Sequence, residues 1–77
     1  MKVEIIRQVI FETMEEMRVN PYGLTFYNTK RGVSVSFISV FGESVKDCFK
    51  YDDELSVLST KAKDLCSKFR EINIPFA

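Results

Sequence analysis

The sequence predicts a small α+β domain whose elements follow the order α-β-β-β-α. Amphipathic helix patterns open and close the chain, and the segment between them alternates apolar and polar residues, which is typical of strands. We therefore expect a meander of three antiparallel strands with both helices packed on one face. The 77 residues are expected to form a single domain, 1–77, because a chain of this size supports one hydrophobic core.

The first helix is predicted over residues 2–18. Its apolar side chains recur at steps of three and four residues, which places them on one face. They are Val3, Ile6, Ile10, Met14 and Met17. Asn20 and Pro21 then favour a helix end, since the residue before a proline is biased away from the helical region.

The first two strands are predicted over residues 24–28 and 33–41, joined as a hairpin. Between them, residues 29–32 supply polar turn positions and a glycine. The apolar positions of the second strand change parity after Phe37. Either a β-bulge near Phe37 and Ile38 turns both apolar sets toward the core, or the far end of the strand is covered on both sides; we expect the bulge.

The third strand is predicted over residues 45–51, although Asp47 falls on its apolar side. The second helix is predicted over 53–72, with Asp52 and Asp53 as capping residues at its start. Its apolar stripe is the most regular in the chain. It consists of Leu55, Leu58, Ala62, Leu65, Cys66, Phe69 and Ile72.

Strand alternation assigns side chains to the two faces of the sheet. The face toward the helices is expected to carry Leu24, Phe26, Val33, Val35, Phe37 and Phe49. The opposite face is expected to carry Thr25, Tyr27, Ser34, Ser36, Lys46, Cys48 and Lys50. Cys48 and Cys66 then lie on different sides of the sheet, so we predict two free thiols and a reducing, cytoplasmic location.

Catalytic chemistry has no recognisable signature in this chain. There is no histidine, the two cysteines are far apart, and no glycine-rich phosphate loop is present. We predict no catalytic residues, no metal site and no cofactor, and hence a protein that is not an enzyme. No apolar run is long enough to span a membrane, and eleven basic residues against eleven acidic ones argue against nucleic acid as the main partner.

One short segment, residues 59–63, reads Ser-Thr-Lys-Ala-Lys. Together with the order of the elements, it resembles the double-stranded-RNA-binding domain. That resemblance implies phosphate contacts from lysines at the start of the second helix. Here residues 52–54 are all acidic, which repels phosphates at that position. As an alternative function, nucleic acid would be bound by Lys30, Arg31, Lys46 and Lys50, with Tyr27 as a stacking platform.

The leading prediction is a small, non-enzymatic interaction module that binds an unidentified protein partner. Its size is typical of accessory proteins of bacteriophages and mobile elements, which bind or inhibit a host protein. Two surfaces compete for this role. One is the open sheet face, with Thr25, Tyr27, Ser34, Ser36, Lys46 and Lys50, and the other is an acidic helix face with Glu12, Glu15 and Glu16.

The last residues suggest self-association. Ile74 and Phe76 follow the predicted end of the second helix and cannot extend its apolar stripe. Each gains about 1.5–3 kcal/mol when fully buried. A short chain has a limited core, and pairing two copies is a common way to bury more area. We therefore expect these two side chains to contribute to a homodimer contact.

Overall fold

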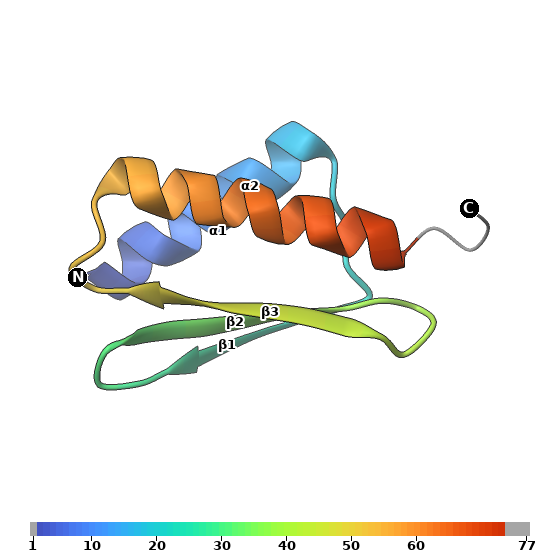
Figure 1. Cartoon of the computed structure of the whole chain (residues 1–77), viewed down its shortest axis with the longest axis horizontal. Helices are drawn as coiled ribbons and strands as arrows, with labels where there is room; N and C mark the ends of the chain where they lie inside the picture. Colours follow the sequence, from blue (N-terminus) through green and yellow to red (C-terminus); the bar gives the residue numbers. More distant parts are fainter. Residues whose placement is uncertain (1, 74–77) are drawn as a thin grey trace.

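The computed structural model describes residues 2–73. Its elements are α1 (Lys2–Met17), β1 (Gly23–Asn28), β2 (Gly32–Ile38), β3 (Ser44–Lys50) and α2 (Leu55–Ile72). The strands form one antiparallel sheet in the order β1-β2-β3, and both helices lie on the same face of it (Figure 1). The predicted fold class and element order are confirmed. Ile74 and Phe76, on which the homodimer prediction depends, lie outside the described residues.

The hydrophobic core lies between the sheet and the two helices. Phe37 from the central strand and Phe69 from α2 meet at its centre, edge to face, with ring centroids 5.6 Å apart. α2 packs along both α1 and β3, and α1 also contacts β2. The remaining core side chains come from both helices, from β2 and β3, and from Val19 after α1, while Leu24 and Phe26 of β1 are only partly buried. These core side chains are Ile6, Val9, Ile10, Val19, Val33, Val35, Phe49, Leu58, Ala62, Leu65 and Cys66.

The predicted bulge in the second strand is wrong. Pairing of β2 with both neighbours continues without interruption to Ile38, where the strand ends. Val40 and Phe41 are exposed in the loop that follows. Ser39 starts this loop: its N–H donates to the Glu43 carbonyl, and its hydroxyl accepts from the Phe41 N–H. The change in parity therefore marks the end of the strand at Ile38, before the predicted limit of 41.

The predicted capping of the second helix is also wrong. α2 begins at Leu55 rather than at 53, with Glu54 at the N-cap and no side-chain hydrogen bond from it. The Asp53 carboxylate instead accepts from the Lys50 N–H, at 3.1 Å, and from Lys61 Nζ, at 2.9 Å. One oxygen of this carboxylate, Oδ2, is thus engaged both by the last strand and by the second turn of the helix.

α1 ends at Met17, one residue before the predicted limit. Arg18 takes a left-handed conformation with φ of 55°, and the Val19 N–H donates to the Met14 carbonyl at 2.8 Å. This pattern is a helix C-cap that usually contains glycine at the left-handed position. Arg70 of α2 donates to the Met17 carbonyl and so links the ends of the two helices.

Candidate protein interaction surface

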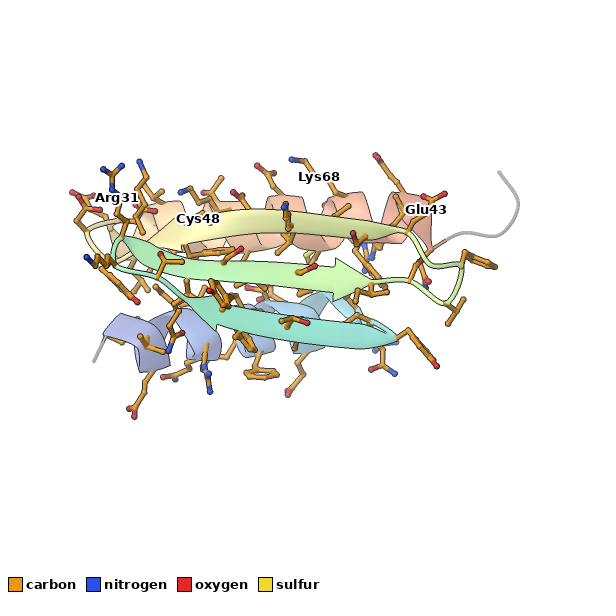
Figure 2. The ribbon with its side chains drawn as sticks, turned by 90° about the horizontal axis from the view of Figure 1, so that it is seen from below. Arg31, Glu43, Cys48 and Lys68 are labelled. Atoms are coloured by element: carbon orange, nitrogen blue, oxygen red, sulfur yellow. The ribbon has the colours of Figure 1, made fainter. Side chains whose placement is uncertain are left out.

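The open face of the sheet is formed by alternate residues of all three strands. Tyr27, Ser34 and Cys48 form one row across the sheet, and Thr25, Ser36 and Lys46 form the next. Figure 2 looks onto this face, with Cys48 labelled on β3. Lys50 lies at the end of β3 beside the first row. The alternation of side chains along the predicted strands therefore assigned these seven residues to the correct face of the sheet.

The acidic helix surface is separate from the open face. Glu12, Glu15 and Glu16 are exposed on α1, which packs on the opposite side of the sheet (Figure 1). Glu12 accepts a hydrogen bond from Gln8 Nε2 at 3.0 Å, one helical turn away. The two surfaces that the sequence offered are thus not brought together into one site.

The two edges of the sheet differ in how their backbone groups are satisfied. In an antiparallel pair, residues alternate between bonding to the neighbouring strand and pointing away from it. The Tyr51 N–H donates to the Arg31 carbonyl, which precedes β2. Every second residue before Tyr51, such as Phe49 and Asp47, therefore bonds to β2, and the residues between them do not. The backbone groups of Cys48 and Lys50 accordingly point outward from the edge.

On β3 these outward groups have side-chain partners. The Cys48 N–H donates to Asp47 Oδ1 at 2.8 Å, and the Lys50 N–H donates to Asp53 Oδ2. Lys61 Nζ donates to the Cys48 carbonyl at 3.1 Å and forms an ion pair with Asp53 at 2.9 Å. The hydrogen bond between these two side chains lowers the pKa of Asp53 and raises the pKa of Lys61. Around Cys48 and Lys50, the β3 edge is therefore closed by the protein's own charged side chains.

On β1 the outward groups have no such partners among residues 2–73. The Thr29 N–H donates to the Gly32 carbonyl, so the alternation directs the N–H and C=O of Leu24, Phe26 and Asn28 away from β2. None of these groups accepts or donates a hydrogen bond within the described residues 2–73. Gly23–Asn28 also contains no charged side chain, whereas edge strands are commonly protected by charges. This edge is open.

Three exposed aromatic side chains border β1. Tyr22 directly precedes the strand and is 77% exposed, and Tyr27 on the strand is 68% exposed. Phe11 of α1 is 49% exposed, although its ring packs on the ring of Phe26 with centroids 5.6 Å apart. The Arg7 guanidinium lies over the Phe26 ring, 5.0 Å from its centroid. The open edge is therefore surrounded by aromatic surface.

The basic residues of the nucleic-acid alternative are brought together only in part. Lys30, Arg31 and Lys50 line a hollow of about 470 Å³ with Tyr51 and Asp52, at the end of the sheet where Figure 2 labels Arg31. The other two predicted residues, Lys46 and Tyr27, do not line it. Lys61, which the resemblance to RNA-binding domains would direct at phosphate, is engaged by Asp53 and the Cys48 carbonyl.

Both cysteines are free, as predicted. Cys48 is exposed on the open face, while burial raises the pKa of the Cys66 thiol to about 11. Within residues 2–73, no three cysteine or acidic side chains gather closely enough to hold a metal ion. No helix in the same part of the chain has the length and apolarity needed to cross a bilayer.

Sequence reasoning missed Phe11, Tyr22 and the open edge as parts of a candidate surface. A signal for the edge was present, because Lys46, Asp47 and Lys50 place charges along β3 while β1 has none. Phe11 was also detectable, since it lies outside the regular stripe of α1.

Comparisons with protein-family models, with curated proteins and with solved structures find no match to this chain.

Proposed function

We propose that this protein is a non-enzymatic interaction module that binds another protein through the side of the domain bordered by β1. The observation that carries the proposal is the grouping of Phe11, Tyr22 and Tyr27 around this strand, each exposed by about half or more. Aromatic side chains are enriched in the binding surfaces of proteins, and tyrosine is among the residues that supply much of the binding energy. The open face beside Tyr27 adds small side chains, such as Ser34 and Ser36, that allow close approach.

The cellular location and origin that we propose rest on the two cysteines and on the size of the chain. We place it in the cytoplasm, because two unpaired cysteines suit a reducing compartment. The small size suits an accessory protein of a bacteriophage or mobile element that binds a host protein. Self-association through Ile74 and Phe76 is retained as a separate hypothesis, which light scattering of a chain shortened to residue 73 would test.

Selection from a phage-displayed library of random twelve-residue peptides tests the proposal without knowledge of the natural partner. We expect the wild-type protein to enrich specific peptides. Tyr27→Ser and Phe11→Ser should weaken their binding at least tenfold each, because truncating an aromatic anchor costs about 2 kcal/mol or more. Affinity is measured by fluorescence anisotropy with the synthetic peptides.

The matched control is Phe41→Ser. Phe41 is also aromatic and exposed, but it lies in the β2–β3 loop rather than on α1 or β1; Ile38 before this loop pairs with Gly23, so the loop lies at the opposite end of β1 from Tyr27. Its substitution should leave peptide affinity unchanged within a factor of two. Enrichment of no peptide, or equal losses for Phe41→Ser and Tyr27→Ser, would contradict the proposal.

Nucleic-acid binding is a second candidate, favoured by the hollow that gathers Lys30, Arg31 and Lys50. Asp52 in the same hollow and the zero net charge of the chain both weaken phosphate attraction. We therefore expect no submicromolar binding to duplex RNA at about 150 mM salt. Submicromolar binding that is lost in Arg31→Ala would make this the leading function.

A further inference from the structure

We infer that the partner is bound by strand addition: an extended segment of another protein pairs with β1 and becomes the fourth strand of the sheet. This inference rests on the proposed function and specifies its mode and the class of partner. The segment would carry apolar side chains at alternate positions. Two independent features lead to it, the hydrogen-bonding capacity of the β1 edge and the position of α1 beside it.

The outward backbone donors and acceptors of the β1 edge are arranged in the pattern that an added strand requires. Leu24, Phe26 and Asn28 each present one donor and one acceptor outward, and their spacing of two residues matches the repeat of a strand. An added strand of about five residues would satisfy all three positions. At the β3 edge, Asp47, Asp53 and Lys61 already occupy outward groups of Cys48 and Lys50, so an added strand could not pair along the whole of that edge.

α1 provides the surface on which the added strand would lie. Seen from the open face, the first turns of α1 project beyond the β1 edge (Figure 2). Phe11 and Arg7 from this part of the helix meet Phe26 of the strand. Alternate side chains of the added strand would face these rings, and burial against them favours apolar residues there. The other side chains would continue the polar open face beside Thr25 and Tyr27.

The same projection of α1 argues against a second copy of this chain as the occupant. Antiparallel pairing of two β1 strands about a two-fold axis would place both helix layers on the same side of the joined sheet. The two strands would be about 4.8 Å apart, whereas packed helices require about 8–10 Å between axes. Because the first turns of α1 already extend past the edge (Figure 2), the two helix layers would be crowded at this junction. A single extended segment has no such helix and fits.

The test uses the synthetic twelve-residue peptides recovered from the display library. Asn28→Pro removes an outward N–H from β1 without removing a bond to β2, and Asn28→Ala keeps this N–H as the matched control. We expect at least tenfold weaker peptide binding in Asn28→Pro and less than a threefold change in Asn28→Ala. In the wild-type protein, bound peptide should slow hydrogen exchange of the Leu24, Phe26 and Asn28 amides at least tenfold.

The outcomes separate the mode of binding from the proposed function. Peptides that bind the wild-type protein but leave those three amides unprotected would overturn strand addition while the interaction module stands. Failure of all peptides to bind would overturn both. The exchange measurement uses the unaltered chain, so it decides the question even if Asn28→Pro does not fold. A dimer that protects the β1 amides without any peptide would overturn the choice of occupant.

Discussion

Replacing Phe37 by alanine is expected to lower the free energy of unfolding by about 3–5 kcal/mol. Phe37 is fully buried on the central strand, and its ring meets Phe69 edge to face. A domain of this length has a total stability of about 4–11 kcal/mol, so this loss removes from about a quarter to all of it. Urea denaturation followed by circular dichroism measures the change.

Phe41→Ala is the matched control for this substitution. The Phe41 side chain is 53% exposed in the β2–β3 loop, so its removal should change the free energy of unfolding by no more than about 0.5 kcal/mol. Similar losses for Phe37→Ala and Phe41→Ala would mean that the core is not centred on the contact between β2 and α2.

Gly32→Ala is expected to have the second largest effect, a loss of about 3 kcal/mol or more. A Cβ at this position would overlap the Phe49 carbonyl oxygen and lie 2.8 Å from the Lys50 Cα. Both are backbone atoms fixed by the pairing of β2 with β3, so the strands themselves would have to separate. Thermal unfolding monitored by circular dichroism would show the loss as a lower Tm.

The control for this prediction is Gly23→Ala in the neighbouring strand. There the added Cβ would meet only the Ile38 side chain, at an ordinary contact distance of 3.4 Å. The expected change is within about 0.5 kcal/mol. Equal Tm shifts for the two variants would indicate that β3 does not approach Gly32 as closely as described.

The elements of this fold were predictable because each has a clear hydrophobic period. Alternation assigned Ser34 and Ser36 to the open face and Val33 and Val35 to the core, since a strand has only two faces. The end of β2 was not predictable in the same way. Val40 and Phe41 look like strand residues, but the side chain of Ser39 organises a loop before them.

Only part of the candidate surface could be predicted from the sequence. The role of Asp53 depends on contacts with Lys50 and Lys61 that form only once α2 lies along β3. Likewise, Lys61 reaches the Cys48 carbonyl across the same contact, which removes it from the role that the RNA-binding resemblance implied. The charges of Lys46, Asp47 and Lys50 distinguish β3 in the sequence, but the contacts of Asp53 and Lys61 with this edge depend on helix placement, which local periodicity does not carry.

Amide hydrogen exchange in the protein without any ligand directly tests the difference between the two edges, with β3 closed at Cys48 and Lys50 and β1 open. The amides of Cys48 and Lys50 should exchange more slowly than those of Leu24, Phe26 and Asn28, because only the first two have hydrogen-bond acceptors. Asp53→Ala should release the Lys50 amide and leave the Cys48 amide protected. Equal exchange at both edges, or protection of the three β1 amides in the monomer, would contradict the account.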